Sequence, residues 1–309
     1  KMNVVLTLIK MLGGLAMFLY GMEIMGDGLK QSSGDALKNF LGKLTHNTVM
    51  GVLTGALVTA IIQSSTATIV LTVALIGAGV LNLKQAVSIV MGANIGTTIT
   101  AQIVALGSFG SSISMTSIFS AFAGIGAFMN LFAKSDKYKK IGGIVAGFGL
   151  LFVGLSLMSD SMEGFAELPE VKEFLASIDS IILLLLLGVI LTAIVQSSSV
   201  VTGIAVVMVA EGMISLDQGI YLTMGSNIGS CIVAIIAGFT SGLNAKRTAL
   251  IHLLFNTFGV VLFVIVGYIV SPFGFSYGMI FQSLFPDMGA VQLAMFHTFF
   301  NCVTVIIML

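Results

Sequence analysis

Polar residues that could bind an anion occur twice, in two short segments of an otherwise apolar chain. The first is Thr-Ala-Ile-Ile-Gln-Ser-Ser at 59–65, and the second is Thr-Ala-Ile-Val-Gln-Ser-Ser at 192–198. Gln, Ser and Thr side chains supply hydroxyls, amide donors and carbonyl oxygens. The two segments lie 133 positions apart, and residues 53–106 align with 186–239 at this spacing without a gap. Duplicated polar motifs of this kind predict one site built from two halves, as in many transporters.

A second polar motif, Gly-x-Asn-Ile-Gly, follows each Gln-Ser-Ser segment, at 92–96 and at 225–229. Glycine destabilises helices and asparagine prefers their caps, so the motif predicts an interruption of its helix. An interruption frees carbonyl oxygens, which together with side-chain oxygens suit a small hard cation such as sodium. The predicted oxygen ligands are Asn94, Thr97 and Thr98 in the first copy and Asn227 and Ser230 in the second.

The composition is that of a polytopic membrane protein. Of the 309 residues, 57% are hydrophobic and 8% are charged, whereas a soluble domain carries about 25% charged residues. The formal net charge is zero, and Arg247 is the only arginine, which argues against nucleic acid as a partner. Cys231 and Cys302 lie in apolar runs. We interpret them as small packing residues, not as a disulfide or a metal site.

The lengths of the apolar segments predict how the chain crosses a membrane. A spanning helix needs about 20 apolar residues. Segments that fit one crossing are 4–25, 85–106, 113–133, 141–158, 219–238, 248–270 and 289–309. The segments 48–80 and 181–210 are too long for one crossing and too short for two. Two arms of about 15 residues reach only some 22 Å each, less than the roughly 30 Å hydrocarbon core. We therefore expect two re-entrant hairpins, each with Gln-Ser-Ser at its tip.

The repeat also extends upstream, which defines two structural units. Residues that match at the same spacing are Gly14 with Gly147, Gly21 with Gly154, Met25 with Met158 and Asp27 with Asp160. A unit with a re-entrant hairpin crosses the membrane three times, so the second unit enters from the opposite face. We predict an all-α polytopic membrane protein with two inverted-topology repeats. The first, 1–133, has its hairpin at 48–80 and an interrupted helix at 85–106. The second, 134–309, has its hairpin at 181–210, an interrupted helix at 219–238, and C-terminal helices.

The distribution of charge orients this arrangement. Basic residues gather on one predicted face, which the positive-inside rule makes cytoplasmic. Besides the 134–140 loop, this face holds Lys30, Lys38, Lys43, Lys84, Lys246 and Arg247. Acidic residues gather on the opposite face, at Glu163, Glu167, Glu170, Glu173, Asp179, Glu211, Asp217 and Asp287. The layout places hairpin 48–80 on the cytoplasmic side, hairpin 181–210 on the outer side, and the C-terminus in the cytoplasm.

Binding an anion at membrane depth requires compensating positive charge. The second arm of each hairpin begins just after the tip, where helix amides and the helix dipole favour an anion. Lys10 is the only basic residue within an apolar segment, and it belongs to no repeated motif. A divalent oxyanion held by neutral donors alone would be costly there. Co-bound cations would offset this cost, which would couple anion binding to cation binding.

Together these motifs resemble the sodium-dependent phosphate cotransporter family, that is, the type II family and its bacterial relatives. The resemblance includes Gly-Met-Glu-Ile-Met-Gly-Asp-Gly-Leu at 21–29 and a His-x-x-Phe-Asn pair at 252–256 and 297–301. It implies sodium-coupled uptake of inorganic phosphate by alternating access across the plasma (inner) membrane, with sodium as coupling ion and no other cofactor. The implied phosphate-binding residues are Gln63, Ser64, Ser65, Thr66, Gln196, Ser197, Ser198 and Ser199. Sodium is implied to be shared between Gln63, Gln196 and the oxygen ligands of the interrupted helices.

Two departures from the family pattern bear on details. The first motif ends in Thr66, which keeps the hydroxyl, and the second interrupted helix has Ser230-Cys231 where the first has Thr97-Thr98. A thiol is a poor sodium ligand, so a cation site expected there is absent or rearranged. Some bacterial relatives carry a soluble regulatory domain after the membrane part, and we expect such a domain to be missing from this chain. A homodimer fits the architecture, with Gly-rich faces such as 142–149 available for contact.

Other interpretations of the same residues stay open. Hydroxyl and amide donors do not distinguish phosphate from arsenate, sulfate or a dicarboxylate, and a membrane-embedded regulatory scaffold is a further alternative. An intramembrane serine hydrolase would pair Ser65 or Ser198 with His252 or His297, but a nucleophile needs one partnered serine, not two equal ones. Ser and Thr in membrane helices also often bond to their own backbone. The Gln-Ser-Ser at 31–33 has no repeat partner, so we assign it no role.

Overall fold

The computed structural model of the chain is helical in most of the residues that it describes. It describes residues 4–45, 47–77, 79–107, 115–166, 170, 173–174, 177–239 and 242–309, and no strand occurs among them. The helices are α1 (Val4–Leu44), α2 (Thr48–Ile62), α3 (Ser65–Gly77), α4 (Leu83–Leu106), α5 (Met115–Phe132), α6 (Asp136–Ala166), α8 (Ile181–Val195), α9 (Ser198–Ala210), α10 (Leu216–Gly229), α11 (Cys231–Phe239), α12 (Leu243–Val270), the 3₁₀ turn η1 (Ser271–Phe273), α13 (Tyr277–Leu284) and α14 (Gly289–Met308). The predicted all-α class is confirmed for this part of the chain.

Six helical segments of the described residues are long and apolar enough to cross a membrane. They are Val5–Met25, Leu83–Leu106, Asp136–Met158, Leu216–Phe239, Leu243–Phe273 and Gly289–Met308. The protein is therefore a multi-pass membrane protein. The predicted crossing at 113–133 begins in residues outside the described part, and its described apolar portion, Ser117–Phe132, is shorter than the six. The predicted acidic-face residue Glu167 also lies outside the described residues.

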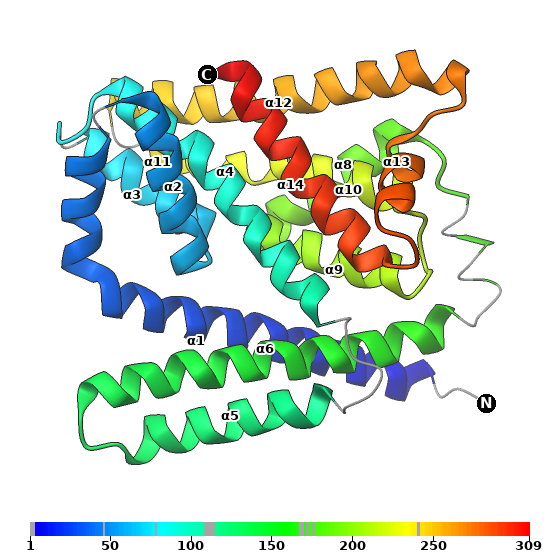
Figure 1. Cartoon of the computed structure of the whole chain (residues 1–309), viewed down its shortest axis with the longest axis horizontal. Helices are drawn as coiled ribbons and strands as arrows, with labels where there is room; N and C mark the ends of the chain where they lie inside the picture. Colours follow the sequence, from blue (N-terminus) through cyan, green and yellow to red (C-terminus); the bar gives the residue numbers. More distant parts are fainter. Residues whose placement is uncertain are drawn as a thin grey trace.

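Helices α1, α6 and α5 form a layer along one side of the molecule (Figure 1). Glycines allow α1 and α6 to approach closely, because a Cβ at Gly14 would lie 2.8 Å from Gly154 O, and one at Gly21 would lie 2.6 Å from Gly147 O. Close backbone contact at small residues is a common means of helix association in membranes. The contact runs in opposite directions along the two helices, so α1 and α6 are antiparallel.

Each of the two segments predicted to form a hairpin contains a pair of short helices. Helices α2 and α3 have 15 and 13 residues, and α8 and α9 have the same two lengths. In each pair the glutamine of Gln-Ser-Ser directly follows the first helix, and the second helix begins two residues after that glutamine. The second pair, at 181–210, has the predicted bounds, and the first ends three residues before the predicted position 80. Re-entry from one side of the membrane remains a prediction.

The predicted interruption of the helix at 85–106 is wrong, because α4 runs unbroken from Leu83 to Leu106. Asn94 stays within the helix by donating its Nδ2 to Val90 O at 3.0 Å. The glycines instead serve packing, since a Cβ at Gly96 would lie 2.5 Å from Ala56 O of α2. The motif therefore joins α4 closely to the hairpin.

The second copy of the Gly-x-Asn-Ile-Gly motif packs in the same way, and its helix does break. A Cβ at Gly229 would lie 2.6 Å from Val189 O of α8, at residues 133 positions after Gly96 and Ala56. The predicted helix at 219–238 is split into α10 and α11 by Ser230 alone, one residue beyond the motif. Ser230 has φ −63° and ψ −21°, close to helical values, so the break is small.

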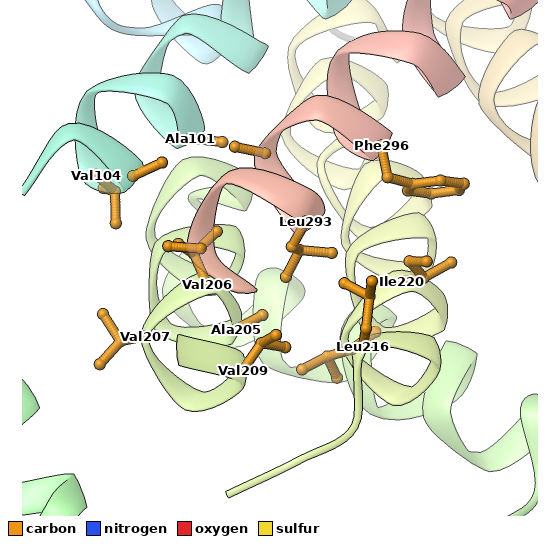
Figure 2. Close-up of a cluster of buried hydrophobic side chains, with 14 of the residues drawn as sticks. Ala101, Val104, Ala205, Val206, Val207, Val209, Leu216, Ile220, Leu293 and Phe296 are labelled. Carbon is orange, nitrogen blue, oxygen red and sulfur yellow. The ribbon is translucent and has the colours of Figure 1, made fainter. Parts of the chain in front are cut away.

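The hairpins pack against the long helices of both halves. Within each half, α2 lies against α4 and α8 against α10. Between the halves, α3 contacts α11 and α12, and α9 contacts α4; within the second half, α9 also contacts α14. Figure 2 shows the apolar cluster around α9. Its labelled residues are Ala205, Val206, Val207 and Val209 of α9, Ala101 and Val104 of α4, Leu216 and Ile220 of α10, and Leu293 and Phe296 of α14. This packing holds α9 against helices of both halves.

Candidate functional site

The tip of the first hairpin is fixed by hydrogen bonds from its own backbone and from α4. Gln63 ends α2 with φ 51° and ψ 31°, in the left-handed region, and only 9% of its surface is exposed. Its Nε2 donates to Ala60 O at 2.6 Å, and its Oε1 accepts from Thr100 Oγ1 at 3.0 Å. Ser64 Oγ accepts from Ala67 N at 3.1 Å and so caps the start of α3.

The two arms of this hairpin are also joined by a buried hydroxyl pair. Thr59 Oγ1 of α2 donates to Thr68 Oγ1 of α3 at 2.9 Å, and Thr68 Oγ1 in turn donates to Ser64 O at 3.2 Å. Both threonines are almost fully buried. The pair therefore ties the arms together one turn below the Gln-Ser-Ser tip.

The tip of the second hairpin has the same backbone but a different environment. Gln196 ends α8 with φ 58° and ψ 24°, and Ser197 caps α9 by accepting from Val200 N at 3.4 Å. Gln196 is exposed, whereas Ser198 and Ser199 are buried. Thr202 Oγ1, one turn further along α9, lies 3.3 Å from Ser226 Oγ of α10. The bonds at each tip stay within their own half of the chain.

The left-handed glutamines are a shared and costly feature of the two tips. For a residue other than glycine this conformation costs roughly 1–2 kcal/mol, and such strain is concentrated at functional sites. Each turn also places the first amides of a helix, at Ser65 in α3 and Ser198 in α9, next to the polar side chains. Helix N-termini attract anions through free N–H groups and the helix dipole. Each tip thus offers hydroxyls, an amide side chain and backbone donors to an oxyanion.

The predicted sodium ligands of α4 bond to their own helix. Thr97 Oγ1 donates to Ala93 O at 2.9 Å, and Thr98 Oγ1 donates to Ile95 O at 2.7 Å. These bonds use the hydroxyl protons and leave oxygen lone pairs. The sodium role of Asn94, Thr97 and Thr98 stays a prediction.

The second copy of these ligands belongs to a buried network that the sequence did not predict. Asn227 Nδ2 donates to Asn301 Oδ1 at 2.9 Å, and Asn227 Oδ1 lies 3.2 Å from His297 Nε2, which therefore carries the proton. Ser230 Oγ donates to Asn227 O at 2.7 Å. The His-x-x-Phe-Asn motif at 297–301 thus holds the asparagine of α10. Its repetition at 252–256 was the available signal in the sequence.

Two further polar contacts of α4 were not predicted. Thr100, which bonds Gln63, has Val233 as its repeat partner, so the repeat gave no signal for it. Gln102 Nε2 donates to Thr298 Oγ1 of α14 at 2.9 Å. A glutamine within an apolar crossing was the available signal for that bond.

Comparison with known proteins assigns the chain to a family. A family model described as Na+/Pi-cotransporter matches residues 17–160 and 164–285. The chain belongs to the Na+/Pi-cotransporter family. This is a family of transporters, and the resemblance carried by the paired Gln-Ser-Ser and Gly-x-Asn-Ile-Gly motifs is confirmed. No solved structure matches the chain.

Among individual relatives, the matches extend from full length to a short segment. YqeW of Bacillus subtilis is 32% identical over 305 residues, which cover 98% of this chain and 94% of that protein. YjbB of Escherichia coli (strain K12), a protein named for inorganic phosphate export, is 28% identical over 98% of this chain and 53% of its own length. Sodium-dependent phosphate transport protein 2B of Homo sapiens is 35% identical over 101 residues, or 32% of this chain and 15% of that protein.

Proposed function

We propose that this member of the Na+/Pi-cotransporter family moves inorganic phosphate across the inner membrane by alternating access, coupled to sodium. The observation that carries the proposal is the pair of Gln-Ser-Ser turns, which share one backbone conformation and one set of donors. The phosphate would bind at both tips. The residues proposed to hold it are Gln63, Ser64, Ser65, Thr66, Gln196, Ser197, Ser198 and Ser199.

The α1–α6 contact supports an inverted relation between the two halves. Gly14 faces Gly154, and Gly21 faces Gly147. Adding 133 to Gly14 and Gly21 gives Gly147 and Gly154, so exchanging the halves maps this contact onto itself. Antiparallel helices that exchange in this way are related by a two-fold axis perpendicular to them. For helices that cross a membrane, this axis lies in the membrane plane, which is the symmetry of inverted repeats.

Helix lengths support re-entry of the two hairpins. The longest arm, 15 residues in both α2 and α8, spans about 22 Å, less than the roughly 30 Å core. Each hairpin would therefore enter and leave on the same side, from opposite faces in the two halves. With the 134–140 loop in the cytoplasm, the C-terminus is also cytoplasmic. A homodimer and a cytoplasmic regulatory domain in the longer protein are compatible with this arrangement.

The composition of the two motifs supports coupling to sodium. Neither motif contains a lysine or arginine, and neutral donors alone leave an oxyanion's charge uncompensated at membrane depth. Bound sodium would supply that compensation. The residues proposed to share it are Gln63, Asn94, Thr97, Thr98, Gln196, Asn227 and Ser230.

Uptake of radiolabelled phosphate into proteoliposomes tests the proposal. We expect uptake driven by an inward sodium gradient, absent when choline replaces sodium, and resistant to excess sulfate. Ser65→Ala and Ser198→Ala should each reduce uptake while leaving the protein folded. Ser33→Ala is the matched control, because 31–33 has the same three letters outside the repeat. Normal transport by both tip variants would contradict the site. Sodium-independent uptake would contradict the coupling, and competition by sulfate at equal concentration would contradict the substrate.

The direction of net transport is the point on which one relative differs. YjbB is named for phosphate export, whereas the proposal for this chain is uptake. A coupled carrier runs in the direction that its gradients set, so the same proteoliposomes test both. Phosphate-loaded vesicles that lose phosphate only when sodium is high inside would show a reversible symporter. Efflux that proceeds equally in choline would favour sodium-independent export.

A further inference from the structure

A polar pocket that the proposed transport site does not use lies among α1, α5 and α6. These three helices lie side by side (Figure 1), and each contributes to the wall of the pocket. The volume of the pocket is about 380 Å³, which is in the range of small-ligand sites. The residues that line it all lie outside the Gln-Ser-Ser and Gly-x-Asn-Ile-Gly motifs of the two halves.

The pocket lies where its helices reach the surface of the membrane. The apolar portion of α1 ends at Met25, and the pocket residues Asp27 and Gln31 follow it. Helix α6 begins at Asp136, within the lysine-rich stretch 134–140. Tyr138 in this stretch is 55% exposed, and tyrosine is enriched at membrane–water interfaces. For helices that cross a membrane, the pocket therefore opens beside the phospholipid headgroups.

The pocket presents charged groups of both signs. Asp27 and Asp136 supply carboxylates, and Lys139 and Lys140 supply ammonium groups, so these four residues together carry no net charge. Within the part of the chain that the structure describes, the charged groups of Asp136, Lys139 and Lys140 make no ion pair or hydrogen bond. A ligand that complements this lining carries an anionic and a cationic group in one molecule.

The shape of the pocket depends on a glycine and on a bond between α5 and α6. A Cβ at the buried Gly143 would lie 3.4 Å from Asn130 Nδ2 and 3.9 Å from Ile24 Cγ2, so the missing side chain leaves the floor open between α5 and α1. Asn130 Nδ2 donates to Lys139 O at 2.9 Å. This bond holds the end of α5 against the turn of α6 that carries the two lysines.

The surface of α5 next to the pocket favours a lipid as the occupant. Phe128, Leu131 and Phe132 flank Asn130 in the sequence and are 65%, 69% and 73% exposed, as expected of side chains that contact acyl chains. Free inorganic phosphate has no cationic group for the two carboxylates. We propose that the pocket binds the headgroup of a phospholipid with a primary ammonium group, such as phosphatidylethanolamine. Its phosphate would lie at the two lysines, and its ammonium group would donate to the two carboxylates.

Native mass spectrometry of the purified chain, titrated with phospholipids of identical acyl chains, measures this binding. We expect phosphatidylethanolamine to bind about tenfold more tightly than phosphatidylcholine, because a choline group has no N–H to donate to a carboxylate. Asp136→Asn should reduce this preference. Changing Lys139 and Lys140 together to Gln should weaken phosphatidylethanolamine binding by about tenfold, because each lysine attracts the phosphate.

Two matched controls separate the pocket from its surroundings. Lys137→Gln changes an exposed lysine of the same turn that does not line the pocket, and it should bind the lipid as the wild type does. Gly143→Leu places a side chain in the floor of the pocket and should prevent binding. Gly13→Leu adds the same side chain at an exposed glycine of α1, where nothing lies within 4 Å of a Cβ, and it should leave binding unchanged.

The outcomes decide both the site and its occupant. Equal affinities of the wild type for phosphatidylethanolamine and phosphatidylcholine would overturn the proposal, as would wild-type affinity in the double lysine variant. Tighter binding of phosphatidylglycerol would indicate an anionic lipid and overturn the assigned headgroup. Displacement of the lipid by inorganic phosphate at constant ionic strength would indicate a soluble anion and overturn it too. If Gly143→Leu does not fold, the lysine variants decide the question. Transport is not measured, so these outcomes are independent of the proposed function.

Discussion

Alanine substitution of the last glycine in each Gly-x-Asn-Ile-Gly motif tests whether these glycines serve close helix packing. A packing role predicts a loss of stability, whereas helix propensity alone predicts a gain. Gly96→Ala and Gly229→Ala add a Cβ that would lie 2.5 Å from Ala56 O and 2.6 Å from Val189 O. Carbon and carbonyl oxygen normally stay about 3.3–3.6 Å apart, so α4 and α10 would have to move from their hairpins by roughly 0.7 Å. The atoms in the way belong to the backbone and cannot rotate aside.

The expected free-energy change follows from two opposing terms. Overpacking costs about 1–3 kcal/mol, and a backbone obstacle places these sites near the upper end. Replacing glycine by alanine inside a helix returns about 1 kcal/mol. Each variant should therefore lose roughly 2 kcal/mol of stability. Gly124→Ala in α5 is the control, because nothing lies within 4 Å of the added Cβ. This variant should gain only the stability that comes from the higher helix propensity of alanine.

Unfolding temperatures of the purified variants in detergent show whether each substitution lowers or raises stability. We expect G96A and G229A to unfold below the wild type, and G124A at or above it. If G96A and G229A are stabilised as much as G124A, the glycines do not hold α4 and α10 against their hairpins.

Two other pairs of repeat partners should respond unequally. Thr59→Val removes the buried hydroxyl bond to the other arm of its hairpin and should cost about 1 kcal/mol of stability. Thr192→Val removes an oxygen without a partner and should be neutral or stabilising. Thermal unfolding of both variants measures this difference, and equal losses of stability would refute it. Gln63→Ala should destabilise the protein by about 1–2 kcal/mol because it breaks a buried side-chain hydrogen bond. Gln196→Ala, at an exposed position, should change stability little. Equal losses of stability in chemical unfolding would contradict the difference in burial between the two glutamines.

The helix breaks at the two Gln-Ser-Ser segments could be predicted because segment length and polarity both constrain them, whereas re-entry stays a prediction. Segments near 30 residues with polar centres leave few alternatives, and the bounds 181–210 and the turn at Gln196 agree with the structure. Helix α1 was less predictable. It continues to Leu44, well past the expected end of the crossing at 25, because the end of an apolar segment does not have to end the helix.

The prediction of an interrupted helix at 85–106 was wrong for a different physical reason. Glycine both weakens a helix and allows another backbone to approach it, and a single sequence does not show the neighbour. Asn94 is equally ambiguous, because an asparagine can cap a helix or bond back within it, as it does to Val90 O. Contacts without a repeat partner, such as Thr100 with Gln63, carried no signal at all.

The two halves of the chain are alike in backbone and unlike in environment, and this difference has an identifiable origin. Gln63 and Gln196 have nearly the same dihedral angles, yet Ile62 is 2% exposed and its partner Val195 is 41% exposed. The hairpins themselves therefore do not set the burial of their tips; the helices around them do. Part of this asymmetry is encoded, since Thr100 can bond Gln63 while Val233 offers Gln196 no hydrogen bond. Under the proposed function, the surroundings of two similar half-sites would have to cover one tip and uncover the other. The two tips differ in burial while their turns keep nearly the same dihedral angles, which is compatible with that requirement.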